Sequence, residues 1–222
     1  MSPETQSEQF AAQREQMVNT QLRARGISDE RVLAAMAGVP RHEFVAEEYR
    51  EQAYEDHPVP IGEGQTLSQP YIVAIMLEAL TLNGPEKVLE VGTGSGYQTA
   101  LLAQLAREVY SIERHAALAH SAENVLRELG YPSVPVMVGD GSEGLPNQAP
   151  FDAIIVSAAA PCIPSPLFEQ LREGGRMVVP VGPAHAQNLQ LVRKLHGQPV
   201  VDNLEGCRFV PLIGGQGYPE GW

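Results

Sequence analysis

The sequence predicts an α/β fold: a doubly wound, mostly parallel sheet with helices on both faces, preceded by N-terminal helices. From residue 87 onward, short apolar runs rich in β-branched residues alternate with helical stretches. These runs lack polar alternation, which is typical of parallel strands buried on both faces. One run leads through a glycine-rich turn into a helix, an arrangement common at the ligand-binding edge of such sheets.

Length and composition agree with one folded unit. The chain has 222 residues, of which 43% are hydrophobic and 19% are charged, and both values are close to globular averages. We expect a single domain over residues 1–222, in which residues 1–82 form helices and a long loop and residues 83–222 form the sheet core.

The net charge limits the partners of the chain. The formal net charge is −12, which would repel a phosphate backbone, so nucleic acid is not an expected partner. No apolar run approaches the ~18 residues of a membrane-spanning helix, and the polar N-terminus is unlike a secretory signal. We therefore expect a cytoplasmic monomer with no membrane association. Cys162 and Cys207 have no CxxC spacing and are predicted to be buried free thiols.

Helical periodicity dominates the N-terminal region. Apolar residues recur every three or four positions over residues 6–25, and Gly26 is the expected helix stop. Ser28 is predicted to cap a short second helix. The stretch 53–69 is rich in Pro and Gly and is predicted to be a long ordered loop. Its end places Ser68 at or near the N-cap of a third helix.

Strand-like runs follow the third helix. Five are predicted at residues 87–91, 108–112, 134–138, 152–156 and 176–181. Two further runs, 189–195 and 207–212, close the chain. The right-handed crossover rule then predicts a doubly wound arrangement for the parallel strands.

The segment KVLEVGTGSGYQTALLAQL carries the strongest local signal. Its glycines permit a sharp turn and let a ligand approach backbone N–H groups at a helix N-terminus. The predicted cofactor loop comprises Gly92, Thr93, Gly94, Ser95 and Gly96. A dinucleotide fingerprint would have its third glycine where Tyr97 stands, so a nicotinamide cofactor is disfavoured. S-adenosylmethionine, which has no phosphates, is the alternative.

Three acidic residues near strand ends suit that cofactor. Glu90 precedes the glycine loop and can attract the ligand's ammonium directly or through water. Glu113 ends the second strand, where its carboxylate can accept hydrogen bonds from ribose hydroxyls. Asp140, followed by Gly141, is predicted to meet the adenine edge. A solvated acid at Glu113 and a turn-forming aspartate at Asp140 are the alternative interpretations.

With these residues, the sequence resembles the protein-L-isoaspartate O-methyltransferase family over roughly residues 17–212. The shared motifs are VPRHEFV, PIGEGQTLSQP, VLEVGTGSGYQTALLA, IER, GDG, APFDAIIVSAA, QLREGGRMVVPVG and FVPL. The resemblance implies a Rossmann-like methyltransferase fold and transfer of a methyl group from S-adenosylmethionine to the α-carboxyl of L-isoaspartyl residues in damaged proteins. S-adenosylhomocysteine is the second product, and collapse of the ester to a succinimide initiates repair. Ala46 departs from the proline that members often have at this place.

The resemblance also assigns the active-site hydroxyl to Ser68. A carboxylate is already ionised at pH 7, so the reaction requires no general base. Hydroxyl and backbone donors can hold such an anion in line with a methyl donor. We therefore predict Ser68 as the catalytic residue, within a substrate-binding set of Ile61, Gln65, Thr66 and Ser68. An ordinary N-cap serine is the alternative role for Ser68.

The residues alone leave other functions open. One is a different methyltransferase that acts on a small molecule, and another is a non-enzymatic binder of S-adenosylmethionine or of a nicotinamide. The six histidines lack metal-ligand spacing, so no metal is predicted, and His57 beside the loop has no assigned role. Arg41 and Arg208 are candidates for a positively charged mouth that would receive acidic substrates.

Overall fold

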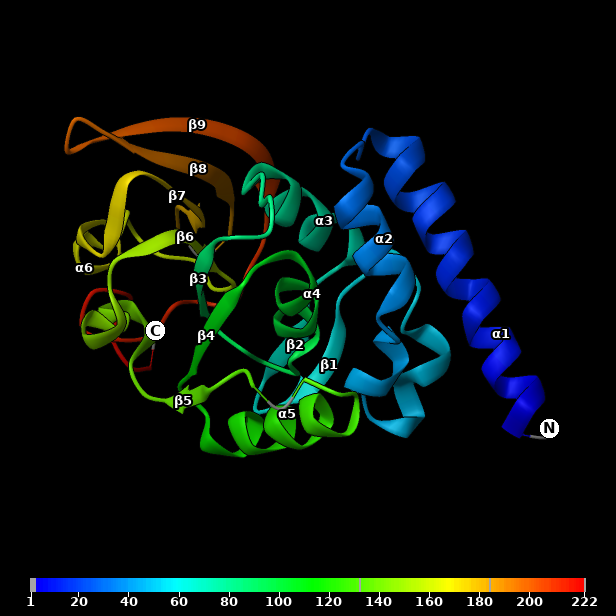
Figure 1. Cartoon of the computed structure of the whole chain (residues 1–222). Helices are drawn as coiled ribbons and strands as arrows, with labels where there is room; N and C mark the ends of the chain where they lie inside the picture. The colour runs from blue at the N-terminus through cyan, green and yellow to red at the C-terminus, as the bar shows by residue number, and fades with distance from the viewer. Residues whose placement is uncertain (1–2, 132, 184, 222) are drawn as a thin grey trace.

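The computed structural model describes residues 3–131, 133–183 and 185–221 (Figure 1). The helices are α1 (Pro3–Gln16), α2 (Glu30–Gly38), α3 (Pro70–Ala79), α4 (Tyr97–Leu105), α5 (Ala116–Glu128) and α6 (Ser165–Glu169). The strands are β1 (Val59–Gly62), β2 (Gln65–Leu67), β3 (Lys87–Val91), β4 (Glu108–Glu113), β5 (Val136–Val138), β6 (Phe151–Val156), β7 (Leu171–Val181), β8 (Gln187–Leu195) and β9 (Gln198–Cys207). Within the described residues, no helix is both long enough and apolar enough to cross a membrane.

Seven strands form one sheet in the order β5-β4-β3-β6-β7-β8-β9. The first five strands in this order are parallel, and β8 and β9 add an antiparallel hairpin at one edge. Val91 of β3 pairs with Ile112 of β4 on one side and with Val156 of β6 on the other. The strand order reverses between β3 and β6, so the predicted doubly wound sheet is confirmed. Such a reversal opens a crevice at the carboxyl ends of the strands.

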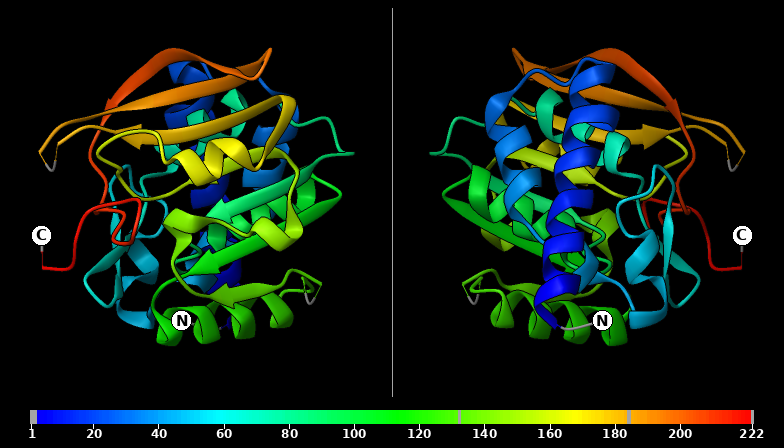
Figure 2. Two further views of the ribbon diagram at one scale, coloured as in Figure 1. Left: turned by 90° about the vertical axis from the view of Figure 1, so that its left-hand side faces the viewer. Right: turned by 90° about the vertical axis from the view of Figure 1, so that its right-hand side faces the viewer.

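The two faces of the sheet bury separate sets of apolar side chains, as alternation along a strand requires. Val88 and Ile155 face the core that contains α1 to α4. Leu89 and Ile154, one residue away on the same strands, face a second core that contains Leu167 of α6. Figure 2 shows α1 and its neighbouring helices in front of the sheet in one view and α6 in front of it in the other.

The N-terminal helical segment continues to Gly26, as predicted. After α1 the chain passes through a π-helical turn, Met17–Leu22, and a 3-10 turn, Arg23–Arg25. Gly26 then adopts φ 98°, a left-handed conformation that ends helices and favours glycine. The π-helical turn was not predicted, because a one-residue shift in winding leaves the spacing of apolar residues nearly unchanged.

The cap of α2 differs from the prediction. The Asp29 side chain, not that of Ser28, accepts a hydrogen bond from Arg31 N at 2.8 Å. Ser28 N instead donates to Glu78 Oε1 of α3 at 2.7 Å. The predicted Ser28 cap was wrong because a glutamate from a helix distant in sequence binds Ser28, and the next residue caps the helix.

The stretch 53–69 is more regular than the predicted loop. It contains the antiparallel hairpin β1–β2, whose turn is centred on Glu63. Gln69 is the N-cap residue of α3 and makes no side-chain capping bond, so Ser68 lies one residue before the cap. The Pro and Gly residues that suggested a loop lie mainly at the ends and in the turn of this hairpin.

The last predicted strand was misplaced. The chain forms β9 over Gln198–Cys207, whereas residues 207–212 are irregular apart from an isolated bridge between Pro211 and Ala159. Nearly all of β9 is exposed at the sheet edge, so it carries no burial pattern to reveal it. The apolar run 207–212 reflects packing instead, since Leu212 is buried in the second core.

Both cysteines are free, but they are not both buried. Cys162 is exposed, so its predicted burial was wrong, and Cys207 is half-buried. Burial raises the pKa of the Cys207 thiol to about 11, which keeps it protonated at neutral pH and unreactive.

Candidate active site

A glycine turn joins β3 to α4 at the carboxyl edge of the sheet. Gly92, Gly94 and Gly96 have φ values of 90°, 54° and 90°, which lie in the left-handed region that glycine occupies without strain. A Cβ atom at Gly94 would lie 3.2 Å from Ile61 Cδ1 of the β1–β2 hairpin. The missing side chain therefore lets the hairpin approach the turn closely.

A cavity that is partly open to solvent lies at the point where the strand order reverses, and the empty space between its walls, open solvent included, is about 930 Å³. The predicted site residues that line it are Ile61, Gln65, Thr66, Ser68, Gly92, Thr93, Gly94, Ser95, Glu113 and Gly141. The predicted residues that do not line it are Glu90, Gly96 and Asp140. The structure thus brings both predicted halves of the site to one cavity.

Glu113 is held rigidly in the wall of this cavity. Its Oε2 accepts a hydrogen bond from Gly94 N at 2.9 Å, and its Oε1 accepts one from His115 N at 2.9 Å. Each carboxylate oxygen has a further lone-pair site. Glu113 can therefore accept hydrogen bonds from two neighbouring hydroxyls, as a ribose requires.

Glu90 lies beneath the cavity and is fully buried. Thr99 Oγ1 and Ser111 Oγ donate to its Oε2 at 2.5 and 2.7 Å, and Gln98 Nε2 donates to its Oε1 at 3.1 Å. Burial raises the pKa of Glu90 to about 7, although these hydrogen bonds act in the opposite direction. Gln98 reaches the cavity and also donates to Ser157 Oγ at 2.8 Å. Glu90 thus borders the site only through Gln98, without the direct access that was predicted.

The Asp140 carboxylate is hydrogen-bonded to its own turn and to the C-terminal segment, although the residue is exposed. It accepts hydrogen bonds from Gly215 N at 2.7 Å, Ser142 N at 2.9 Å and Ser142 Oγ at 2.7 Å. Partial burial raises the pKa of Asp140, but these hydrogen bonds outweigh it and lower the pKa below its usual value. Asp140 does not line the cavity, whereas the next residue, Gly141, does, so a contact between the Asp140 carboxylate and the adenine edge stays a prediction.

Ser68 and Thr66 lie where the first cavity meets a second one. The second cavity is also lined by Ser157 and Val210 of the first, and it extends to His185 and Arg208. The segment around β1 and β2 lies beside the C-terminal segment in both views of Figure 2. A group held at Ser68 can therefore meet ligands in both cavities.

Sequence reasoning missed several cavity residues. Ser157 follows β6 directly, so the strand-end rule that identified Glu113 applies to it equally. His115, for which the sequence predicts no more than a surface or capping role, is the N-cap residue of α5 and also lines the cavity, and its Nδ1 lies 3.6 Å from Glu63 Oε2 at the hairpin turn. Leu212 and Ile213 complete the wall from the C-terminal segment; Leu212 belongs to the shared motif FVPL, but nothing in that motif indicated a place in the cavity.

The two arginines proposed for the mouth have different positions. Arg208 lines the second cavity, whereas Arg41 is fully buried and cannot form part of a surface mouth. His57 lines neither cavity, and its Nε2 lies 2.9 Å from Glu55 Oε2. Among the described residues, no group of three or more His, Cys, Asp and Glu side chains could hold a metal ion.

A reversed parallel sheet, a GxGxG turn and an acid at the end of the neighbouring strand form a crevice for a nucleoside-containing ligand, and they are the features expected of an S-adenosylmethionine-dependent methyltransferase. Comparison with known proteins identifies the family. Residues 12–217 match the model of the protein-L-isoaspartate(D-aspartate) O-methyltransferase family, and the chain belongs to this family.

Relatives and solved structures agree with this family. A protein-L-isoaspartate O-methyltransferase of Koribacter versatilis is 60% identical over 94% of both chains, and one of Syntrophus aciditrophicus is 56% identical over 95% of this chain and 98% of that protein. A solved protein-L-isoaspartate O-methyltransferase superposes with a TM-score of 0.83 at 31% identity, covering 92% of this chain and 67% of that one. A Plasmodium falciparum structure described as the same enzyme, in complex with S-adenosyl-L-homocysteine, gives a TM-score of 0.78 at 25% identity over 90% and 98% of the two chains.

Proposed function

We propose that the chain methylates the α-carboxyl of L-isoaspartyl residues in damaged proteins and peptides at the junction of its two cavities. Ser68 is the catalytic residue in this proposal, and it forms the substrate side together with Ile61, Gln65 and Thr66. The chain forms a single domain in this proposal, in which residues 1–82 contain the N-terminal helices and the substrate segment and residues 83–222 form the sheet core.

The position of Ser68 carries the proposal. Ser68 and Thr66 line both the cavity that contains the glycine turn and the wider second cavity. A methyl transfer between a nucleoside cofactor and a polypeptide needs such a junction, because the two molecules must meet end to end while their remaining parts stay apart. The hydroxyls at this junction can donate to a substrate carboxylate without protonating it.

Residues on the other side of the junction suit the cofactor. The predicted loop Gly92, Thr93, Gly94, Ser95 and Gly96 leads into α4. Its glycines leave the backbone open to close approach by a ligand, although Gly92 N, Gly94 N and Gly96 N already donate to Ile112 O, Glu113 Oε2 and Thr93 O. Glu113 provides a fixed acceptor for ribose hydroxyls. Glu90 supports Gln98 from below, and Asp140 fixes the turn that presents Gly141. S-adenosylmethionine supplies an electrophilic methyl group on a sulfonium.

The residues of the chain act mainly by orientation. The substrate carboxylate is ionised at neutral pH, so no side chain has to remove a proton from it. Holding a nucleophile in line with its target contributes up to roughly 7 to 11 kcal/mol to a rate. The hairpin β1–β2 approaches the glycine turn through Ile61, whose apolar side chain forms part of the cavity wall.

A matched pair of peptides tests this function. Isoaspartyl and aspartyl isomers of one peptide are incubated with the chain and labelled S-adenosylmethionine, and base-labile methyl ester is counted. We expect label on the isoaspartyl isomer alone. Equal labelling of both isomers, or of neither, would refute the proposal and favour a methyltransferase with a small-molecule substrate.

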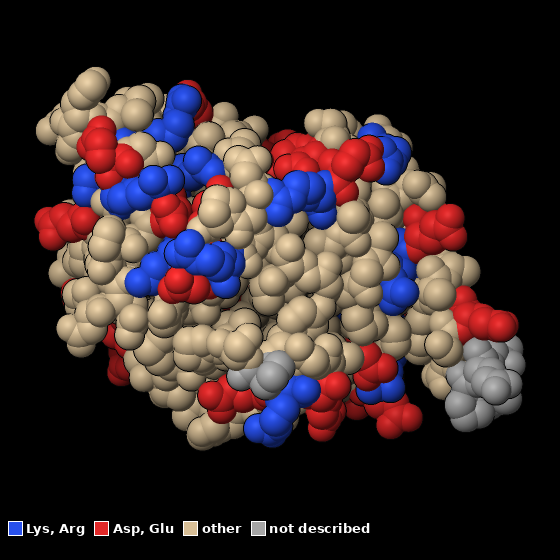
Figure 3. Space-filling view, viewed as in Figure 1, with Lys and Arg blue, Asp and Glu red and all other residues tan. Residues whose placement is uncertain are grey.

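We further propose that the chain acts as a cytoplasmic monomer without nucleic acid. Its two cysteines are free and one is exposed, as is usual in a reducing compartment. The net charge is −12, and basic and acidic side chains lie next to one another across the face in Figure 3. A surface of this kind does not attract a polyanion. Sedimentation at two protein concentrations tests the monomer.

A further inference from the structure

Arg41 joins three parts of the site from inside the protein. It begins the 3-10 turn Arg41–Phe44 and has no exposed surface. Its Nη2 donates to the backbone carbonyl of Ser68 at 2.8 Å, and its Nε donates to the carbonyl of Ala53 at 2.6 Å. The guanidinium thus binds the backbone of the predicted catalytic serine from a buried position that lines neither cavity.

The same guanidinium also contacts the cofactor half of the site. Its Cζ lies 4.9 Å from the ring centroid of Tyr97, a cation–π distance. Tyr97 is fully buried, begins α4 and directly follows Gly96 of the glycine turn. Arg41 therefore links Ser68 to the turn that carries the cofactor loop, and its planar group contacts both at once.

Arg41 is a buried cation without an anionic partner. No described carboxylate lies within ion-pair distance of it, and its Nη1 is buried with no hydrogen-bond partner. Burial lowers the pKa of Arg41 to about 10, so the group is still charged at pH 7. Burying an unpaired charge costs several kcal/mol. A well-packed apolar side chain would avoid this cost, so stability alone does not explain an arginine at this position.

We propose that Arg41 is a positioning residue for methyl transfer: its buried guanidinium sets the Ser68 backbone, and thereby the Ser68 hydroxyl, relative to the glycine turn. The inference rests on the proposed function of Ser68. A direct ion pair between an arginine and the substrate carboxylate would stabilise the charged ground state more than the transition state, in which that charge is lost. A cation that acts through a carbonyl orients the site without this penalty.

The feature to test is the planar guanidinium of Arg41, which donates in two fixed directions, and not only its charge. A lysine keeps the charge but cannot donate in two fixed directions. We expect Arg41→Lys to lower kcat on the isoaspartyl peptide by about tenfold, with peptide KM and S-adenosylmethionine Kd within about twofold of wild type. The titration that gives the Kd also gives the concentration of folded binding sites. The kcat is therefore calculated per binding site and not per total protein.

A double-mutant cycle separates positioning from general damage. If Arg41 acts through Ser68, Arg41→Lys should change kcat less than about twofold once Ser68→Ala is present. The matched control is Arg31→Lys, because Arg31 donates to the carbonyls of Leu82 and Leu105 far from the cavities. This control should leave kcat within about twofold in both backgrounds.

The outcomes are distinct. Failure of the wild type to methylate the isoaspartyl peptide would refute the proposed function itself. With an active wild type, an additive cycle, or a kcat for Arg41→Lys equal to that of Arg31→Lys, would overturn the role of Arg41. If Arg41→Lys does not fold, Arg41→Gln, whose amide can donate to one carbonyl, takes its place in the same cycle with the same expected result.

Discussion

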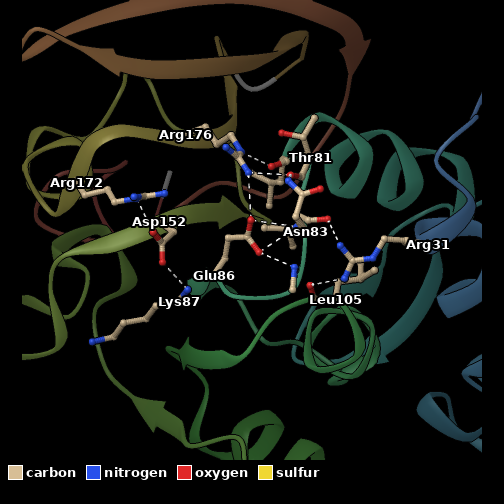
Figure 4. A network of polar contacts seen from close by, with 12 residues as sticks. Arg31, Thr81, Asn83, Glu86, Lys87, Leu105, Asp152, Arg172 and Arg176 are labelled. Carbon is tan, nitrogen blue, oxygen red and sulfur yellow. Dashed lines mark hydrogen bonds and ion pairs between the residues drawn. The ribbon is translucent and has the colours of Figure 1, made fainter.

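At the amino edge of the sheet charged side chains form ion pairs, whereas two titratable side chains at the carboxyl edge are buried with no opposite charge beside them. Figure 4 shows the amino edge, where Arg176 approaches Glu86 at 3.6 Å and Arg172 pairs with Asp152. At the carboxyl edge, Arg41 and Glu90 are fully buried with no opposite charge beside them. The comparison suggests that charges at one edge stabilise the fold, while charges at the other serve the site.

The largest expected effect tests the cofactor side of the carboxyl edge. Glu113→Ala removes a charged acceptor for two hydroxyls, each hydrogen bond being worth about 1.5 to 3 kcal/mol. We expect the Kd for S-adenosylmethionine to rise by about 100-fold or more, measured by calorimetry. The control is Glu123→Ala, at an exposed position on α5. A rise no larger than that of the control would exclude ribose binding by Glu113.

The second prediction concerns the amino edge. Glu86 accepts hydrogen bonds from Asn83 N and Gly84 N and lies near Arg176. Glu86→Ala should lower the free energy of unfolding by about 3 kcal/mol, because it leaves buried donors and a cation unpaired. Urea unfolding measures this loss. A lowered kcat per folded molecule would contradict the division between the edges.

The third prediction uses the protonation of Glu90. Its pKa is raised to about 7 in the folded chain, above an unfolded value of about 4.3. The folded state therefore binds more protons between these values, so stability falls as pH rises from about 4.5 to 7. Relative to Glu90→Gln, the wild type should lose about 2 to 3 kcal/mol between pH 5 and pH 8 in urea unfolding. If the difference in unfolding free energy between the wild type and Glu90→Gln does not change with pH, the pKa of Glu90 is not raised in the folded chain.

The smallest of these effects is expected at the substrate side. Ser68→Ala should lower kcat by about 30-fold, or about 2 kcal/mol, because one donor to the carboxylate is lost. The Kd for S-adenosylmethionine should stay within about twofold. Ser165→Ala, at an exposed position on α6, is the control. Equal changes in kcat and Kd would argue against a substrate role.

Local patterns predicted much of the fold and the cofactor side. Strand β3 and the glycine turn follow from short-range rules, and Glu113 follows from its place at a strand end. Ser68 followed from the family resemblance. These features depend on neighbours in sequence or on motifs, so one sequence suffices to find them.

Long-range contacts account for what was missed. The burial of Arg41 depends on carbonyls 12 and 27 residues away, and one hydrogen bond of the Asp140 carboxylate comes from a backbone N–H 75 residues away. Strand β9 is held in place by its pairing with β8, and its side chains are mostly exposed. None of these partners can be inferred from spacing or hydropathy.

The wall of the cofactor cavity combines residues from distant parts of the chain. Ile61 comes from the early hairpin, while Leu212 and Ile213 come from the C-terminal segment. During synthesis this wall is completed only after residues 212 and 213 have left the ribosome. Nascent chains that still lack these residues should thus be unable to retain S-adenosylmethionine.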